Sequence, residues 1–247
     1  MPQSTIGGAQ YLSKGLSLIW QPGVRAFVFI PLLINLVLLS GATFYAISNL
    51  SDWYEGLKNS EYSIVQWSVE NMGWLLWPLI VISVLGVVIF FFAFIANWIA
   101  APFNGLLSEA VERHLAGGSL NQQPTSMKSL VADIPRLLAR EWRKLTYYLP
   151  RALGCLLLFV TPLAIIAPII WFLFNSWMAA IQYIDYPMDN HKVPFRNMLD
   201  MIKQRRSGPF SFGAVVMLLT MIPVVNIFVM PVAVAGATNL WFDHYRE

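Results

Sequence analysis

Four long stretches of the chain contain no charged side chain. They cover residues 26–51, 71–108, 152–184 and 207–242, with lengths of 26, 38, 33 and 36 residues. Because a helix rises about 1.5 Å per residue, about 20 apolar residues cross the ~30 Å hydrocarbon core of a bilayer. We therefore predict that the first two stretches form long transmembrane helices, over residues 24–51 and 71–115.

The third and fourth stretches are too short for two full crossings each, at about 20 residues per crossing plus a turn. Basic loops flank the third stretch on both sides, and the positive-inside rule places both loops in the cytoplasm. The loop over residues 51–70 is acidic and should face outwards, with the N-terminus inside. The third stretch should therefore enter and leave the membrane on the same side.

Prolines lie in the middle of both shorter stretches: Pro162 and Pro168 in the third, Pro223 and Pro231 in the fourth. Proline removes a backbone donor and breaks or kinks a helix. We expect two hemi-penetrating, or re-entrant, helical hairpins with arms of about 24 Å. One lies with a basic helix in residues 125–184, and the other in residues 207–242. The alternative is a pair of kinked single spans.

The N-terminal segment has a weaker apolar pattern. Ile6, Leu12, Leu16, Ile19 and Trp20 recur at roughly helical spacing, which predicts a short amphipathic helix over residues 6–20 at the membrane interface. An ordinary connector is the alternative. The segment lacks the uninterrupted apolar core and the cleavage site of a signal peptide.

Composition supports a single all-α integral membrane domain over residues 1–247. The chain is 57% hydrophobic and only 12% charged, against about 25% charged in soluble domains. The sequence shows no phosphate-binding loop, GxSxG or HExxH pattern, and its three histidines have no metal-ligand spacing. We expect no enzyme activity, catalytic residue, cofactor, metal or nucleic-acid partner.

The first candidate site is the turn formed by Gly23, Val24 and Arg25, which follows Pro22 at the start of the first long helix. The first N–H groups of a helix have no partner within the helix and favour an anion. Arg25 adds a planar guanidinium suited to a tetrahedral oxyanion. The alternative is an arginine that reaches lipid phosphates at a helix end.

The second candidate site is a charged core between two helices. Arg136, Arg140 and Lys144 recur every four residues and share one helical face. We expect acidic groups of the second long helix to pair with these cations and to leave positive charge for an anion. The alternative is an amphipathic helix on acidic headgroups. The candidate residues are Glu109, Glu112 and Arg113 on the second long helix, and Arg136, Arg140 and Lys144 on the following one.

The stretch DYPMDNHKVPF, residues 185–195, is rich in turn-forming and polar residues. It is interpreted as a cap between the two hairpins. Histidine is the side chain that most often serves as a switch at physiological pH, so His191 is a candidate gate, as is Asn226 in the fourth stretch. A histidine with an ordinary structural hydrogen bond is the alternative.

Five segments closely resemble the CysZ family of bacterial sulfate permeases, in the same order and over residues 15–245. They are QPGVRAFVFIPLLINLVL, IANWIAAPFNGLLSEAVE, PRLLAREWRKLTYYLPRA, DYPMDNHKVPF and MIPVVNIFVMPVAVAGATNLW. The resemblance implies a multi-pass protein of the bacterial inner (cytoplasmic) membrane that takes up sulfate for cysteine biosynthesis. It also implies two long transmembrane helices with two hemi-penetrating hairpins.

The resemblance extends to site residues and partners. It places sulfate at Gly23, Val24 and Arg25, although many relatives carry a second arginine where this chain has Ala26. It also implies a polar core, which maps onto Glu109, Glu112, Arg113, Arg136, Arg140 and Glu141. Its partners would be sulfate, membrane lipids and further copies of the chain, in an oligomer built from dimers that can be antiparallel.

Without a nucleotide-binding motif, transport should be channel-like or driven by an ion gradient. Two alternatives stay open at this point. One is a channel for other oxyanions, such as sulfite or thiosulfate. The other is a lipid-organising membrane protein that does not transport.

Overall fold

The computed structural model describes residues 7–118 and 127–246. Within these ranges the chain folds into helices and short turns, without strands. Four of the described helical segments are long and apolar enough to cross a membrane: Arg25–Lys58, Ser63–Phe92, Ala167–Asn190 and Pro223–His244. The prediction of an all-α membrane protein is confirmed.

The chain divides into two units. One consists of Met1–Val28 and Pro102–Glu247, and the other of Phe29–Ala101. The second unit contains most of α2 (Arg25–Ser48), all of α3 (Leu50–Lys58) and the first part of α4 (Ser63–Leu115). Compared with the predicted ranges 24–51 and 71–115, α2 ends slightly earlier and α4 begins eight residues earlier, at Ser63.

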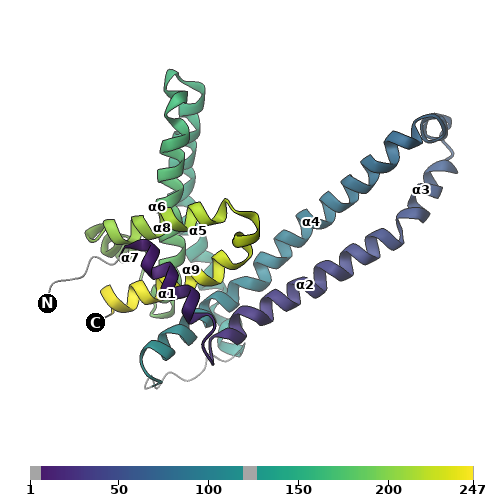
Figure 1. Cartoon of the computed structure of the whole chain (residues 1–247). Coiled ribbons are helices and arrows are strands. Elements are labelled where there is room, and N and C mark those ends of the chain that lie inside the picture. Colours follow the sequence, from purple (N-terminus) through teal and green to yellow (C-terminus); the bar gives the residue numbers. More distant parts are fainter. Residues whose placement is uncertain (1–6, 119–126, 247) are drawn as a thin grey trace. The chain divides into compact units, whose positions relative to one another are not determined.

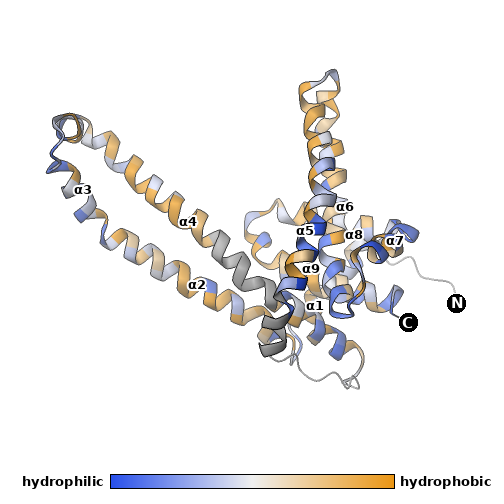
Figure 2. Cartoon of the chain, turned by 180° about the vertical axis from the view of Figure 1, so that it is seen from behind, coloured by the Kyte–Doolittle hydropathy of each residue, from blue (hydrophilic) through white to orange (hydrophobic). Residues whose placement is uncertain are grey.

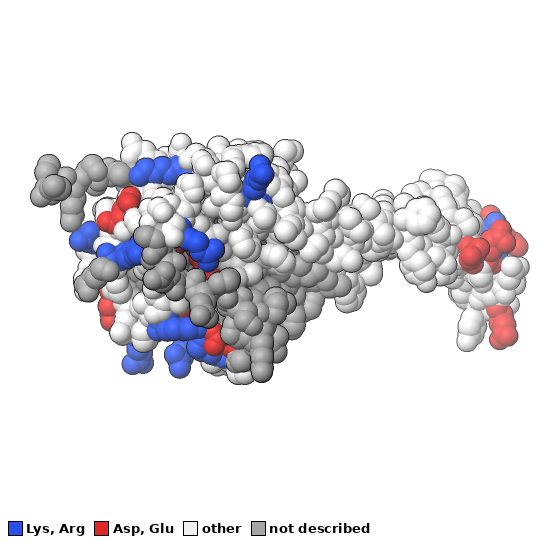
Figure 3. All heavy atoms as spheres, turned by 90° about the horizontal axis from the view of Figure 1, so that it is seen from below, with Lys and Arg blue, Asp and Glu red and all other residues white. Residues whose placement is uncertain are grey.

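The helices of the Phe29–Ala101 unit bury little of their apolar surface. Figure 2 shows hydrophobic residues along α2 and the described part of α4. None of the most apolar window of Ser63–Phe92 is buried. Near α3, the rings of Tyr54 and Trp77 meet edge to face at 4.8 Å. Acidic residues gather around α3 (Figure 3). Apolar helices with so little protein cover are suited to contact with lipid.

The other unit is built around two helical hairpins (Figure 1). The first pairs α5 (Met127–Leu157) with α6 (Ala167–Asn190), and the second pairs α8 (Ser207–Thr220) with α9 (Pro223–His244). The short α7 (Phe195–Gln204) connects them. α6 packs against α8 and α9, while α1 (Gly8–Leu18) also packs against α8 and α9.

Prolines mark the break in each hairpin. Between α5 and α6 lie two 3₁₀ turns; Pro162 begins the second, and Pro168 lies in the first turn of α6. Pro223 begins α9 after a break at residues 221–222. A proline at the start of a helix loses no intrahelical bond. The break predicted at Pro231 is wrong, because Pro231 lies inside α9.

The predicted arm length of about 24 Å is wrong for three of the four arms, because α5, α6 and α9 have 31, 24 and 22 residues. Both α6 and α9 are long enough to cross a membrane. α8, with 14 residues, is a short arm of about 21 Å. The depth to which either hairpin enters the bilayer stays a prediction.

The N-terminal helix forms over Gly8–Leu18, and only some of its predicted apolar residues pack against the protein. Tyr11, Leu12 and Ile19 are buried, whereas Leu16 and Trp20 are 51% and 57% exposed. Ile6 lies outside the described residues. Spacing of large apolar residues did not reveal the packed face because glycine helps to form it.

Glycines bring helix backbones into direct contact. A Cβ atom added to Gly213 of α8 would lie 2.9 Å from the backbone N of Ala180 in α6, and closer still to the carbonyl of Ser176. A Cβ added to Gly15 of α1 would lie 2.7 Å from the backbone N of Gly236 in α9. Small residues that allow such close approach are typical of helix interfaces in membranes.

Candidate functional site

The Gly23–Arg25 turn presents an arginine on the surface. Gly23 adopts φ +85°, a conformation that glycine reaches without strain. Val24 is fully buried and anchors the turn, while Arg25 is exposed and begins α2. The N–H groups of Val24 and Arg25 both donate to the carbonyl of Gln21, at 3.1 Å. These two backbone donors are therefore engaged, and the guanidinium is the principal donor offered to an anion.

Within residues 7–118 and 127–246, a large group of ion pairs joins α5 to α6, and we call it the α5–α6 ion-pair cluster. Three cations on one face of α5 meet two carboxylates on α6, with the same four-residue spacing on both helices. Partners at the periphery complete it. Its members are Asp133, Arg136, Arg140, Glu141, Lys144, Asp185, Asp189 and Lys192.

Arg140 lies at the centre of this cluster. Its Nε and Nη2 donate to Oδ1 of Asp185 at 2.9 and 2.6 Å, and its Nη1 donates to the carbonyl of Val193 at 2.7 Å. Nη1 also lies 3.0 Å from Oδ1 of Asp189. Arg140 is 7% exposed and Asp185 is 3% exposed, so both charges are balanced within the protein.

Arg136 extends the cluster towards the surface. It donates to both oxygens of Asp189, at 2.5 and 3.0 Å, and to Oδ2 of Asp133 at 3.1 Å. Lys192 also pairs with Asp133. Hydrogen bonds from Lys192 and Arg136 hold the pKa of Asp133 below its ordinary value.

Lys144 lies at the end of the α5–α6 ion-pair cluster that is opposite to Arg136. Its Nζ lies 2.8 Å from Oδ2 of Asp185 and 2.5 Å from Oε1 of Glu141. Burial disfavours the charged form of Lys144, but the two carboxylates outweigh burial, and the pKa of Lys144 lies above its ordinary value. Lys144 therefore stays protonated at neutral pH.

The acidic partners described for this cluster differ from the predicted ones. The carboxylates that face Arg136 and Arg140 are Asp185 and Asp189 of α6, with Asp133 of α5 as a further partner of Arg136. The prediction named acidic residues of α4 instead. In this cluster four cations meet four carboxylates, so its acidic and basic groups are equal in number.

The sequence pattern does not identify Asp185 and Asp189 as partners of the cations, because the stretch over residues 185–195 is rich in turn-forming residues. They form the last turns of α6, and Pro187 is accommodated inside that helix. Their spacing could have revealed them as partners, because Asp185 and Asp189 are four residues apart, as are Arg136 and Arg140.

A second polar group, the α4–α9 polar cluster, contains Glu112, His191, Trp241 and Arg246. Glu112 is 1% exposed, and its Oε2 lies 2.8 Å from Nε2 of His191. His191 stacks on Trp241 with ring centroids 4.4 Å apart. Oε1 of Glu112 has no hydrogen bond within the described residues, and Nε of Arg246 lies 3.7 Å from it. His191 is thus the partly exposed partner of a buried carboxylate.

The remaining predicted residues have different surroundings. Glu109 and Arg113 are partly buried on α4, near Glu112 in the sequence. Glu141 is exposed, and Asn226 is exposed in the first turn of α9. Among the described residues, no hydrogen bond or ion pair joins the side chain of Arg25 or Asn226 to either cluster. Within residues 7–118 and 127–246, no group of three His, Cys, Asp or Glu side chains could hold a metal ion.

Comparison with protein families gives one match, which spans most of the chain. The family model described as "Sulfate transporter CysZ/Etoposide-induced protein 2.4" matches residues 11–231. The matched range includes the Gly23–Arg25 turn, the whole α5–α6 ion-pair cluster, and Glu112 and His191.

Proposed function

The chain belongs to the family of the sulfate transporter CysZ and etoposide-induced protein 2.4, and on this basis we propose that it carries sulfate across the bacterial inner membrane. The sulfate would supply cysteine biosynthesis. The match over residues 11–231, together with the apolar helices, carries this proposal. The chain would act as a homo-oligomer built from dimers and surrounded by lipid, and it would transport without catalysing a reaction.

Arg25 would make the first contact with sulfate. A guanidinium offers several N–H donors in one plane and binds oxyanions through paired hydrogen bonds. The positive φ of Gly23 and the buried Val24 fix the turn, so that the exposed Arg25 is held at the start of α2. A conducting protein needs binding that is weak enough for release, and a single exposed arginine meets that condition.

We assign the gate to the α4–α9 polar cluster rather than to the α5–α6 ion-pair cluster. In the α5–α6 ion-pair cluster the acidic and basic groups are equal in number, so the cluster has no surplus positive charge to attract an anion. In the α4–α9 polar cluster, the buried carboxyl of Glu112 lies 2.8 Å from Nε2 of His191 and 3.7 Å from Nε of Arg246. A buried carboxylate that lost these partners would repel an anion. Movement of His191 would remove one of these partners. Transport would be channel-like or driven by an ion gradient, without ATP hydrolysis.

Uptake of radiolabelled sulfate into proteoliposomes tests the proposal. We compare the native chain with Arg25→Ala and with Arg196→Ala, which removes an exposed arginine outside the proposed site. The native chain should transport above empty liposomes. Arg25→Ala should lower uptake at low sulfate concentration because the first contact is lost, and Arg196→Ala should match the native chain.

Each other result has a distinct meaning. Uptake that Arg25→Ala leaves unchanged would preserve transport but refute the assignment of the site. Stronger inhibition by sulfite or thiosulfate than by unlabelled sulfate would identify another oxyanion as the substrate. No uptake above empty liposomes would refute transport and favour a lipid-organising role.

A further inference from the structure

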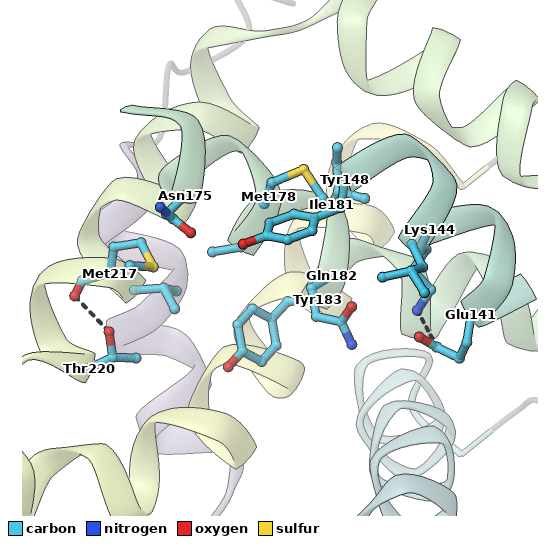
Figure 4. Close-up of a pocket in the computed structure, with 13 residues that line it drawn as sticks. Glu141, Lys144, Tyr148, Asn175, Met178, Ile181, Gln182, Tyr183, Met217 and Thr220 are labelled. Atoms are coloured by element: carbon cyan, nitrogen blue, oxygen red, sulfur yellow. Dashed lines mark hydrogen bonds and ion pairs between the residues drawn. The ribbon is translucent and has the colours of Figure 1, made fainter. Parts of the chain in front are cut away.

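A cavity of about 390 Å³ lies between α5, α6 and α8, apart from the residues to which we assign transport (Figure 4). Helix α5 contributes Glu141 and Lys144, α6 contributes Met178 and Tyr183, and α8 contributes Met217. The cavity is wide open to the surface, and its volume lies within the range of small-molecule pockets. It is therefore a candidate ligand site in a protein that is otherwise surrounded by lipid.

The lining of the cavity has a charged end and mainly apolar walls, in which Asn175, Gln182 and Thr220 are further polar side chains. Figure 4 shows Glu141 and Lys144 together at one end, joined by their ion pair, with Met178 and Met217 farther along. Most of the lining is apolar. Such a lining suits an amphiphile, with its polar group at the charged end and its hydrocarbon along the methionines.

The charged end offers both signs of charge. Lys144 uses two of its three N–H donors on Asp185 and Glu141. Glu141 is 60% exposed, and the pair with Lys144 involves only its Oε1. A headgroup with a negative charge alone would be repelled by Glu141. A headgroup with a phosphate and an ammonium could satisfy the remaining donor of Lys144 and the second oxygen of Glu141.

The surface beyond the cavity can receive the rest of such a molecule. Along α5, after Leu145 in the cavity wall, Leu149, Leu153 and Leu156 are 49%, 53% and 47% exposed. They continue along the arm of the hairpin towards its apolar tip. An acyl chain that leaves the cavity could therefore keep an apolar contact along α5.

We propose that this cavity binds a zwitterionic phospholipid whose headgroup carries a primary ammonium. The phosphate accepts a hydrogen bond from Lys144, the ammonium donates to Glu141, and one acyl chain lies against Leu145, Met178 and Met217. The bound lipid covers the joint between the first hairpin and α8. This site is separate from the proposed sulfate contact at Arg25.

The test measures which lipid the full chain retains. The protein is reconstituted in vesicles of equal parts phosphatidylethanolamine and phosphatidylglycerol, extracted in mild detergent, and its bound lipids are counted by mass spectrometry. The native chain should retain phosphatidylethanolamine in clear excess. Met217→Trp, which fills the cavity, should lower this retention by about tenfold, the loss expected when about 1.4 kcal/mol of binding is removed.

Two further variants make the result specific. Met221→Trp adds the same ring at a residue that is 62% exposed and does not line the cavity, and it should retain the native amount. Glu141→Gln keeps the shape of an exposed side chain and should abolish the preference between the two lipids. A thermal unfolding curve for each variant identifies any loss that results from misfolding.

Three results would overturn the proposal. They are equal retention of the two lipids by the native chain, unchanged retention in Met217→Trp, and an unchanged preference in Glu141→Gln. If Met217→Trp instead dissociates the oligomer with no change in bound lipid, the occupant is a second copy of the chain. Sulfate uptake is not measured, so failure of this proposal is distinct from failure of the transport proposal.

Discussion

The two helical hairpins are held in place by different interactions. α5 and α6 are joined by the ion-pair cluster, centred on the buried Arg140 and Asp185. α8 is joined to α6 by direct backbone contact at Gly213, and α9 is joined to α1 by the same kind of contact at Gly15. The contact between α5 and α6 therefore depends on matched charges. The contacts of α8 with α6 and of α9 with α1 depend on glycine, which has no side chain to keep the helices apart.

This difference determines which changes each hairpin tolerates. A buried ion pair can often be replaced as a whole by apolar residues with little loss, whereas removal of one partner leaves an uncompensated charge. A backbone contact at glycine has no such replacement, because any larger residue forces the helices apart. We therefore expect glycine substitutions to be the more damaging.

The largest effect should follow Gly213→Leu. The new side chain would meet the backbone of α6 at Ser176 and Ala180, which cannot move away as a flexible side chain could. We expect the yield of monodisperse protein in detergent to fall to near zero, measured by size-exclusion chromatography. The matched control is Gly154→Leu on α5, where an added Cβ has no atom within 4 Å. A native yield for Gly213→Leu would show that α6 and α8 are not in contact as described.

A smaller but substantial effect should follow Asp185→Asn. The change leaves Arg140 and Lys144 with one carboxylate fewer between them, and such a loss typically lowers the free energy of unfolding by about 3–5 kcal/mol. Unfolding of the protein in mixed micelles measures it. Adding Lys144→Gln restores the balance of charge and should recover part of the loss.

The control for that change is Asp200→Asn, which removes a 71% exposed carboxylate 3.9 Å from Lys203. It should alter the free energy of unfolding by about 0.5 kcal/mol or less. If Asp185→Asn is equally mild, the cluster does not hold α5 against α6, and the contrast between the hairpins fails.

The smallest effect should follow Asp133→Asn, at the exposed edge of the same cluster. Surface pairs contribute at most about 1 kcal/mol. Because the pKa of Asp133 is lowered by Lys192 and Arg136, its contribution is present above the ordinary value of 3.8 and lost as the pH falls below it. The native chain and the variant should therefore differ at pH 7 and converge at low pH. A difference that grows on acidification would contradict the assignment.

Much of the fold was predictable because it depends on local sequence signals. Charge-free stretches gave the long helices, and Pro162 and Pro223 marked the breaks of the two hairpins. Pro231 misled because the rest of α9 is so well packed that the helix continues through it. The packed face of α1 was missed because hydrophobic spacing does not reveal a contact made through Gly15.

The site was predictable in its cations but not in their partners. Arg136 and Arg140 were recognisable from their spacing along one helix. Their acidic partners lie about 50 residues later, at Asp185 and Asp189, inside a segment whose proline and asparagine favour a turn. Tertiary ion pairs there stabilise the helix against its local preference, and only the folded arrangement shows this.

The α5–α6 ion-pair cluster also has a consequence for the order of synthesis. Arg140 and Asp185 are 45 residues apart in the sequence. At a translation rate of about 5–20 residues per second, Asp185 is therefore synthesised roughly 2–9 s after Arg140. Unpaired ions are costly inside a bilayer. During this interval nascent α5 should stay at the aqueous surface, and it can enter the membrane only after α6 has emerged. We therefore expect this hairpin to enter the membrane as a pair of helices and not as two successive ones.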